Sequence, residues 1–364
     1  MRSLSLRTLE AEARECLTPP VYDFFAGGAE DEITLRANEA AFARFGLIPR
    51  VLRGSGAPEL GLSLFGRRLA VPVLVAPTAF HRLAHPDGEL ATARACAAAG
   101  TVMIAAMAST VAIEKIVAAA RDRAPDGLAP WFQLYIQPDL DFTAAVVQRA
   151  EAAGCAALVL SADSPALGHR ERDLRNGFLD LPEGLCCENM RELGRGAAQA
   201  QPRSLVFSPD VSWAHIDWLR KSTSLPILVK GIAHPDDARL AVEHGAGGVI
   251  VSNHGGRQLD GVPASLELLP GIAAAVGDKV PVLLDGGIRR GSDVIKAVAL
   301  GADAVAIGRP ALWGLAVDGE TGVGQVLEML RAEIARALML CGCASLREAG
   351  RELVRANNTS EVTC

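Results

Sequence analysis

The stretch PILVKGIAHPDDARLAVEHGAGGVIVS, residues 226–252, contains the repeating unit from which the fold can be inferred. It begins with an apolar run at 226–230, continues through a helix-like segment at 235–244 and ends in a second apolar run at 248–252. Short runs that are apolar almost throughout are typical of parallel strands covered on both faces, and a helix usually connects two such strands. The stretch therefore predicts one strand–helix–strand unit.

The same alternation extends along the chain in both directions. Strands are predicted at 71–76, 102–106, 131–136, 157–161, 226–230, 248–252, 280–285 and 304–307. Helices are predicted at 88–99, 113–121, 142–153, 214–222, 235–244, 264–276, 291–300 and 322–340. Eight strand–helix units favour an α/β fold whose strands close into a (β/α)8 TIM barrel. An open doubly wound sheet would prefer a Gly-x-Gly-x-x-Gly turn after its first strand, and the chain has Ala76-Pro77-Thr78-Ala79 there.

The domain organisation follows from length and periodicity. A chain of 364 residues suits a single barrel domain, 1–364, with an N-terminal helical segment at 1–65 before the first strand. The segment 177–211 follows the fourth strand and shows little periodicity, which predicts a long loop. Because barrels place their active sites at the C-terminal ends of the strands, we expect it to be an active-site loop.

Composition and charge argue against several function classes. Half of the residues are hydrophobic, the net charge is -6, and Lys and Arg form no stripe, so no nucleic-acid partner is expected. The polar start, the absence of an 18-residue apolar run and the lack of a peroxisomal address at 360–364 predict a cytoplasmic protein without a membrane partner. The eight cysteines form no Cys-x-x-Cys pair, so neither a metal site nor a disulfide framework is predicted.

Polar residues and glycines gather where the last four predicted strands end. These positions are Lys230, the stretch SNHGGRQ at 252–258, the stretch DGGIRR at 285–290, and Gly308-Arg309-Pro310. The last two predict a phosphate site. Gly286 and Gly287 let the backbone approach an anion, and a helix that begins near Gly291 offers unpaired N–H groups. Gly308 and Arg309 repeat the arrangement after the eighth strand, at the usual phosphate position of barrels.

His254 and Arg257 are the candidate base and anion-binding group. A base beside a guanidinium suits a substrate that carries both a proton to be removed and a carboxylate to be held. The alternative is that both side chains only satisfy backbone carbonyls at a strand end. Lys230 needs an anionic or electron-rich partner inside a barrel, which could be a reduced flavin or, alternatively, Asp285 in an internal ion pair.

At these residues the chain resembles the FMN-dependent 2-hydroxy-acid oxidase and dehydrogenase family, which includes glycolate oxidase, long-chain hydroxy-acid oxidase and mandelate dehydrogenase. The resemblance covers residues 22–346, and the stretch 252–258 matches the family's signature. It implies a barrel that carries FMN and oxidises an L-2-hydroxy acid to the 2-oxo acid. It also implies a homo-oligomer, by similarity a tetramer.

The resemblance also implies a role for individual residues. His254 matches the catalytic base, Asp285 the partner that orients it, and Tyr135 the group that hydrogen-bonds the substrate hydroxyl. Arg257 matches the carboxylate clamp, and Arg170 a second arginine at the substrate mouth. The residues that match the flavin site are Pro77, Thr78, Ala79, Ala106, Gln133, Ser161, Lys230, Ser252, Asp285, Gly287, Arg289, Gly308 and Arg309.

Three positions depart from the family pattern. Phe24 replaces a substrate-binding Tyr, Ala106 replaces a Ser that meets the flavin, and Ala108 stands where glycolate oxidase has a bulky Trp. Loss of the indole opens an apolar space large enough for a ring or an aliphatic chain. We therefore expect an aromatic or a medium- to long-chain 2-hydroxy acid as substrate, with oxygen as the acceptor and hydrogen peroxide as a product. Two alternatives remain open at this point: a dehydrogenase that passes electrons to a quinone or protein, and an FMN-dependent tailoring enzyme for a peptide or other natural product.

Overall fold

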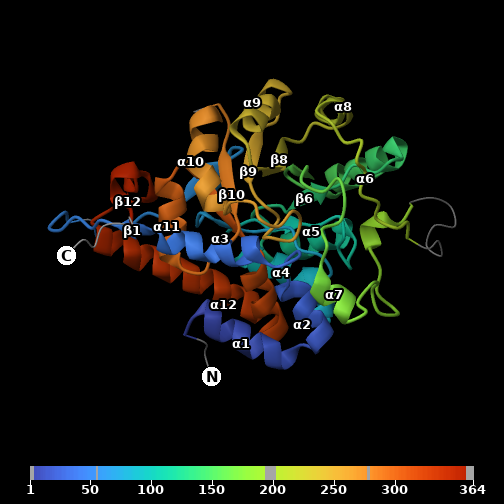
Figure 1. Cartoon of the computed structure of the whole chain (residues 1–364), viewed down its shortest axis with the longest axis horizontal. Coiled ribbons are helices and arrows are strands. Elements are labelled where there is room, and N and C mark those ends of the chain that lie inside the picture. Colours follow the sequence, from blue (N-terminus) through green and yellow to red (C-terminus); the bar gives the residue numbers. More distant parts are fainter. Residues whose placement is uncertain (1–3, 55, 193–201, 277–278, 358–364) are drawn as a thin grey trace.

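Eight parallel strands form a closed barrel in the computed structural model, which describes residues 4–54, 56–192, 202–276 and 279–357 (Figure 1). The strands are β4 (Val73–Val75), β5 (Ile104–Ala105), β6 (Trp131–Leu134), β7 (Leu158–Ser161), β8 (Ile227–Ile232), β9 (Gly248–Val251), β10 (Val282–Asp285) and β11 (Ala304–Ile307). They pair in the order β4-β11-β10-β9-β8-β7-β6-β5. A parallel bridge between Val75 and Met103 joins the two ends of this order. The predicted (β/α)8 barrel and all eight of its strands are confirmed.

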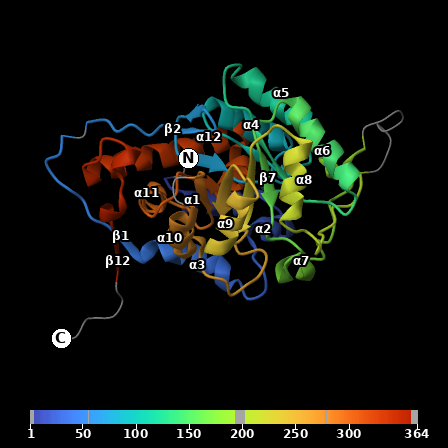
Figure 2. The same ribbon diagram turned by 90° about the horizontal axis from the view of Figure 1, so that it is seen from above.

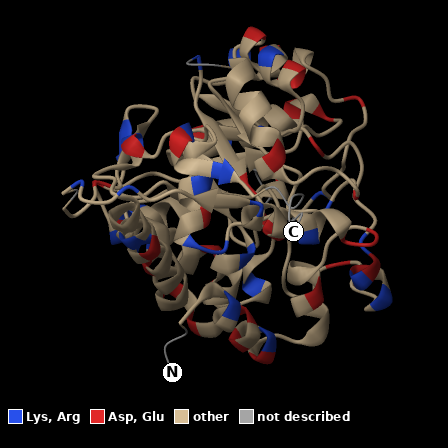
Figure 3. Cartoon of the chain, turned by 60° about the vertical axis from the view of Figure 1, so that its left-hand side comes forward, with Lys and Arg blue, Asp and Glu red and all other residues tan. Residues whose placement is uncertain are grey.

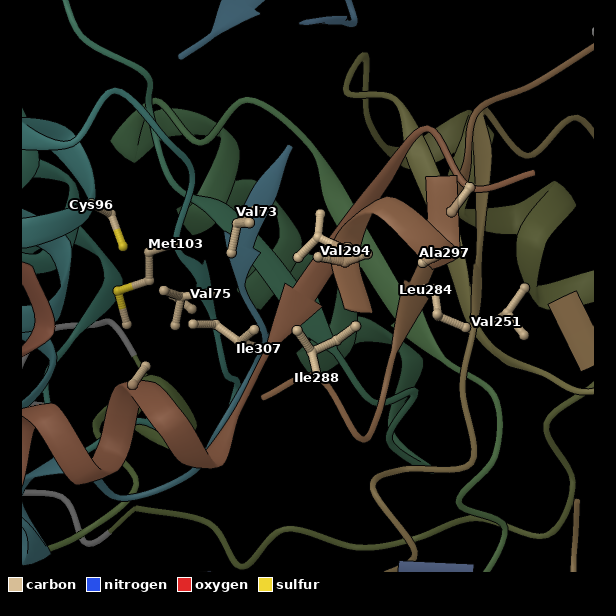
Figure 4. Close-up of a cluster of buried hydrophobic side chains, with 14 of the residues drawn as sticks. Val73, Val75, Cys96, Met103, Val251, Leu284, Ile288, Val294, Ala297 and Ile307 are labelled. Atoms are coloured by element: carbon tan, nitrogen blue, oxygen red, sulfur yellow. The ribbon is translucent and has the colours of Figure 1, made fainter. Parts of the chain in front are cut away.

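Alternation along each strand divides the buried residues into two cores. Leu74, Ile104 and Leu228 belong to the cluster that fills the barrel interior. Val73, Val75 and their counterparts on the other strands belong to the larger cluster between the sheet and the helices (Figure 4). Neighbouring side chains on a strand point to opposite faces, so one apolar run supplies both cores.

A short hairpin covers the N-terminal end of the barrel. It consists of β2 (Leu62–Leu64) and β3 (Arg67–Leu69), and its Leu64 and Leu69 join the interior cluster. Phe65, which lies in the turn between these two strands, packs edge-on against Trp131, the first residue of β6. The two ring centroids are 5.5 Å apart. Apolar side chains therefore fill the N-terminal end of the barrel, and the polar side chains that line a cavity lie at the C-terminal ends of the strands.

Helices surround the barrel. They are α4 (Gly88–Ala98), α5 (Ile113–Arg123), α6 (Leu140–Ala153), α8 (Ala214–Ser222), α9 (Pro235–Glu243), α10 (Ser265–Val276), α11 (Gly291–Ala299) and α12 (Arg309–Cys341). The last helix begins earlier than the predicted 322–340. It consists of two helical parts joined at Asp318 and Gly319, where the backbone leaves helical geometry and Gly319 has φ 52°. The second part matches the predicted helix at 322–340, and the first part, which precedes Asp318, was not predicted.

The N-terminal segment contains α1 (Leu6–Cys16), α2 (Pro19–Ala26) and α3 (Ile33–Ala43), and α1 packs against α12 (Figure 1). Strand β1 (Phe45–Leu47) pairs antiparallel with β12 (Val354–Ala356). After β7 the chain forms α7 (Glu171–Arg175) and the short helix η2 (Glu188–Met190). Positions 193–201 of the predicted loop lie outside the described residues.

Candidate active site

A cavity of about 750 Å³ lies at the C-terminal ends of the strands. The residues compared individually with the family pattern that line it are Phe24, Pro77, Thr78, Ala79, Ala106, Ala108, Gln133, Tyr135, Arg170, Lys230, His254, Arg257, Asp285, Gly287, Arg289, Gly308 and Arg309. Ser161, the last residue of β7, and Ser252, which follows β9, also match the family pattern. Both are buried, but neither lines the cavity. The barrel thus brings residues from positions 24 to 309 to one place.

His254 is hydrogen-bonded to Asp163. Its Nδ1 lies 3.0 Å from both carboxylate oxygens of Asp163, and its backbone N–H donates to Oγ of Ser252 at 3.0 Å. Asp285, which the sequence comparison suggested as the orienting partner, instead lies beside Lys230. That prediction was wrong because Asp163 and Asp285 both follow strand ends, and only the position of the strands in the barrel decides which carboxylate meets the imidazole. The available signal was an acidic residue two positions after β7.

The His254–Asp163 pair is arranged as a base and its orienting group. Burial lowers the pKa of His254, and the charge of Asp163 opposes this. Burial opposes ionisation of Asp163, but the charges of His254 and Lys230 outweigh it and hold the pKa of that carboxyl well below its usual range. An imidazole that donates its Nδ1–H to a carboxylate carries its lone pair on Nε2, which is the form a general base requires.

Tyr135 lies near this pair as a protonated phenol. Burial and the negative charge of Asp163 raise its pKa. Its ring packs edge-on against Phe207 of the long loop, with centroids 5.2 Å apart. The hydroxyl can therefore donate a hydrogen bond to a substrate oxygen over the whole ordinary pH range.

Two buried guanidinium groups face the same cavity. Burial and the charges of Arg170 and Arg309 lower the pKa of Arg257 well below its usual value. One of its nitrogens, Nη1, donates to the carbonyls of Phe24 at 2.8 Å and Gly27 at 2.7 Å. Nε of Arg170 is buried and has no hydrogen-bond partner within the described part of the chain. The hydrogen bonds from Arg257 to backbone carbonyls agree with the alternative that this side chain only satisfies carbonyls at a strand end. Two positive charges in one cavity nevertheless favour an anionic ligand.

Phe24 and Ala108 make part of the cavity wall apolar. The ring of Phe24 stacks on Phe80 at 5.7 Å and meets Phe178 of the long loop at 5.1 Å. The guanidinium of Arg257 lies over the same ring, 5.2 Å from its centroid. The aromatic cluster Phe24–Phe80–Phe178 was not foreseen, because Phe178 reaches the cavity from a segment without periodicity.

Lys230 forms the internal ion pair that was considered as an alternative. Its Nζ lies 3.3 Å from Oδ2 of Asp285 and donates to Oγ of Ser252 at 2.9 Å. Burial alone would lower the pKa of Lys230, but Asp285 and Asp163 outweigh it and raise that pKa. The lysine is therefore a fixed cation that also lines the cavity.

Several buried polar atoms fit a flavin nucleotide. Gln133 Nε2, Ser161 Oγ, Asp285 Oδ1 and Arg289 Nε have no hydrogen-bond partner among the residues that the structure describes. Buried polar atoms are normally paired, so atoms like these mark where a polar ligand is held. Ring nitrogens and carbonyls, a ribityl chain and a phosphate together offer suitable partners.

The start of α11, where the sequence predicts free N–H groups for a phosphate, differs from that prediction. The N–H groups at the start of α11 are already used: those of Arg289 and Arg290 donate to Asp293 at 3.0 and 2.9 Å, and that of Gly291 donates to Glu333 at 2.7 Å. Carboxylates therefore cap this helix, and the prediction that its N-terminus offers free N–H groups was wrong.

The other residues that the sequence predicts for a phosphate site lie in two glycine-containing turns. Gly287 has φ 81°, and a Cβ there would overlap the carbonyl oxygen of Asn38. Gly308 is the N-cap residue of α12, and no side chain caps this helix within the described part of the chain. The guanidinium of Arg309 donates to the carbonyls of Phe25, Gly255 and Gly27. Its side chain thus ties the N-terminal segment to the barrel.

Comparison with known proteins agrees with this site. Residues 13–356 match the family described as FMN-dependent dehydrogenase. The chain is 44% identical over 366 residues to 2-hydroxyacid oxidase 1 of Homo sapiens, covering 98% of this chain and 97% of that protein. It is 47% identical over 353 residues to an L-lactate oxidase of a Nostoc species, covering 95% and 96%. A solved structure of mandelate oxidase with benzoyl-formic acid superposes with a TM-score of 0.88 at 44% identity, covering 98% of this chain and 99% of that one.

The fold and the cavity define a flavin-dependent barrel enzyme. The chain belongs to the FMN-dependent dehydrogenase family, and its cofactor is FMN.

Proposed function

We propose that this enzyme oxidises an L-2-hydroxy acid to the 2-oxo acid and passes the electrons to oxygen, giving hydrogen peroxide. The observation that carries the proposal is the His254–Asp163 pair facing the same cavity as the guanidinium groups of Arg257 and Arg170. A partly buried base beside two cations suits a substrate with a carboxylate next to the carbon that loses hydrogen. Relatives named as oxidases of hydroxy acids, lactate and glycolate support it.

Each residue has a defined part in this reaction. Arg257 and Arg170 hold the substrate carboxylate and so place its C2 carbon within the barrel mouth. His254 takes one proton from the substrate through Nε2, and Asp163 stabilises the imidazolium that forms. Tyr135 donates a hydrogen bond to the C2 oxygen. FMN supplies the acceptor for the two electrons, and Lys230 supplies positive charge near it. The geometry serves hydride and carbanion routes alike, since both need the same base.

The apolar wall favours a large side chain on the substrate. Ala108 is buried in the cavity wall, and the rings of Phe24, Phe80 and Phe178 line the space around it. We propose that an aromatic or a medium- to long-chain acid occupies this space. We also propose that 177–211 is an active-site loop, because its Phe178 and Phe207 contact Phe24 and Tyr135. Structures of mandelate oxidase among the relatives support an aromatic substrate.

Anaerobic mixing with a panel of L-2-hydroxy acids tests the function. Bleaching of the flavin absorbance by mandelate or 2-hydroxyoctanoate is the expected result. No bleaching by any free acid would overturn the proposal and bring the natural-product tailoring reaction forward. Admission of oxygen then tests the acceptor: one hydrogen peroxide per 2-oxo acid is expected, whereas slow reoxidation by oxygen and fast reoxidation by a quinone would favour a dehydrogenase.

We also propose a cytoplasmic homo-oligomer without a nucleic-acid partner. No helix among the described residues is long and apolar enough to cross a membrane. In Figure 3 basic and acidic residues are interspersed, which does not resemble a nucleic-acid footprint. Self-association is supported by the projecting segment after β1 (Figure 2), where Leu52 is 102% exposed. Exposed Leu340 belongs to the end of α12, which this segment contacts through a hydrogen bond from Arg50 N to the Cys341 carbonyl at 3.1 Å. Exposed apolar side chains on these two neighbouring segments favour a protein interface.

A further inference from the structure

A buried hydrogen-bonded chain leads away from the cavity, and the proposed reaction does not use it. His81, in the short helix η1 (His81–Leu83), is 1% exposed. Its Nε2 lies 2.7 Å from Oγ1 of Thr78, and its Nδ1 lies 2.9 Å from Oγ1 of Thr92 in α4. Because Thr78 lines the cavity, the imidazole connects a cavity hydroxyl to a second, fully buried one.

The surroundings hold His81 in one place. Its backbone N–H donates to Oε1 of Glu89 at 3.1 Å, and the same carboxylate accepts from the backbone N–H and the hydroxyl of Thr110, both at 2.7 Å. The residue before it, Phe80, has φ 62°, a left-handed conformation that is unfavourable for a side chain of this size. Such a conformation persists only where the surroundings enforce it.

The protonation of His81 decides how the Thr78 hydroxyl can be used. Burial lowers the pKa of His81, while the charge of Glu89 and a hydrogen bond to the Thr78 backbone oppose this without reversing it. The neutral ring carries one hydrogen, so one ring nitrogen donates and the other accepts. We infer that the hydrogen is on Nε2, the nitrogen beside Oγ1 of Thr78, so that Nδ1 accepts from the hydroxyl of Thr92. In this tautomer Oγ1 of Thr78 accepts from His81, and its own hydrogen remains available.

We propose that His81 is a positioning residue that holds the Thr78 hydroxyl as a hydrogen-bond donor toward the FMN ring system. The proposal rests on the FMN site and not on the identity of the substrate. Thr78 lies between Pro77 and Ala79, which also line the cavity, and its Cγ2 is 3.3 Å from where a Cβ of Gly308 would be. A fixed donor stabilises the form of the flavin with more negative charge, which is the reduced form. His81 would thus help to set the reduction potential without touching substrate or flavin.

The midpoint potential of the bound FMN, measured by reductive titration against a reference dye, tests this. Thr78→Val removes the donor, and we expect about a tenfold shift of the equilibrium toward oxidised flavin, which is about 30 mV for a two-electron couple. His81→Phe should shift the potential in the same direction, because the hydroxyl then loses the partner that orients it. His81→Gln, whose amide can still donate, should restore most of the native value. His215→Phe, at a histidine that does not line the cavity, is the matched control and should leave the potential unchanged.

The double variant Thr78→Val/His81→Phe separates positioning from a general packing effect. If His81 acts only through the Thr78 hydroxyl, the double variant has the potential of Thr78→Val alone. Additive shifts, or an unchanged potential in Thr78→Val, would overturn the proposal. Thr78→Val and His81→Gln suffice for this decision if His81→Phe does not fold. A native chain that takes up no FMN would overturn the proposal together with the flavin assignment, whereas bound flavin that no 2-hydroxy acid reduces would overturn only the proposed function.

Discussion

The pairing of His254 with Asp163 has consequences for individual substitutions. His254 is the only imidazole that lines the cavity among the described residues, so no neighbouring ring can replace it as a base. Its backbone adopts φ 58°, and its N–H is held by Ser252, which fixes where the ring can lie. Substitutions at this pair should therefore change the chemistry more than the binding of FMN.

His254→Ala should retain FMN and reduce it slowly. We expect the rate of anaerobic flavin reduction to fall by about 10²–10⁴-fold, the usual contribution of a general base. Stopped-flow absorbance gives the rate, and the visible spectrum of the purified variant reports FMN content. His215→Ala serves as the control with native rate. Fast reduction in His254→Ala would show that another group takes the proton.

The pH dependence should follow the neutral form of His254. Burial holds its pKa below its usual value, and the base acts only when unprotonated. The rate should therefore rise with pH through an apparent pKa below about 6.5 and then level off. Asp163→Asn removes a charge that raises this pKa, so the acidic limb should move to lower pH while the plateau falls. A limb that moves to higher pH in Asp163→Asn would contradict the pairing.

Ala108 should control the size of the preferred substrate. We expect the native ratio of kcat/KM for mandelate or 2-hydroxyoctanoate over glycolate to exceed about ten, which requires about 1.4 kcal/mol of differential stabilisation. Burial of a phenyl ring can supply about 2–3 kcal/mol. Ala108→Trp fills this space and should remove most of the preference. Glycolate as the best substrate of the native enzyme would show that the apolar wall does not serve the substrate.

At the scale of elements, the kinked helix α12 brings its two parts into close contact. A Cβ on Gly322 would overlap the carbonyl oxygen of Gly314, so only glycine fits at this crossing. The break at Asp318 and Gly319 allows the crossing, because a straight helix would keep the two glycines two turns apart. The first part of α12 is thereby packed against the second, and α12 also packs against α1.

Gly322→Ala should destabilise the protein by about 1–3 kcal/mol, the usual cost of overpacking. Urea denaturation followed by circular dichroism measures the free energy of unfolding. Gly324→Ala is the matched control in the same helix, since a Cβ there meets no atom within 4 Å. It should raise the stability by about 0.5–1 kcal/mol, because alanine is favoured over glycine in helices. Equal effects of the two substitutions would mean that the crossing carries no packing constraint.

At the scale of the whole molecule, the exposed side chains of Leu52 and Leu340 predict self-association. Light scattering of the native chain should give a mass that is a multiple of the 38.1 kDa protomer. Leu52→Asp together with Leu340→Asp should lower that mass, because a charge in an apolar interface is costly. Leu4→Asp, at another exposed leucine, should not change it. A native monomer would remove the support for an oligomer.

The sequence by itself determined the architecture and most of the site. Eight apolar runs separated by amphipathic segments can bury both faces only in a closed or covered parallel sheet, so the barrel follows from local periodicity. Residues next to strand ends, such as Tyr135, Lys230 and His254, could be placed in one cavity because parallel strands of a barrel all end on the same side. Local patterns carry this information without any knowledge of distances.

Only the tertiary structure decided which of these residues meet. Asp163 and Asp285 are both acids at strand ends, and the order of strands around the barrel gives the first to His254 and the second to Lys230. The carboxylate of Glu333, 42 positions further along the chain, accepts from the first N–H of α11. The contact of Phe178 with Phe24 depends on the path of an irregular loop. Contacts of this kind depend on packing between segments distant in sequence, so a local periodic pattern does not predict them.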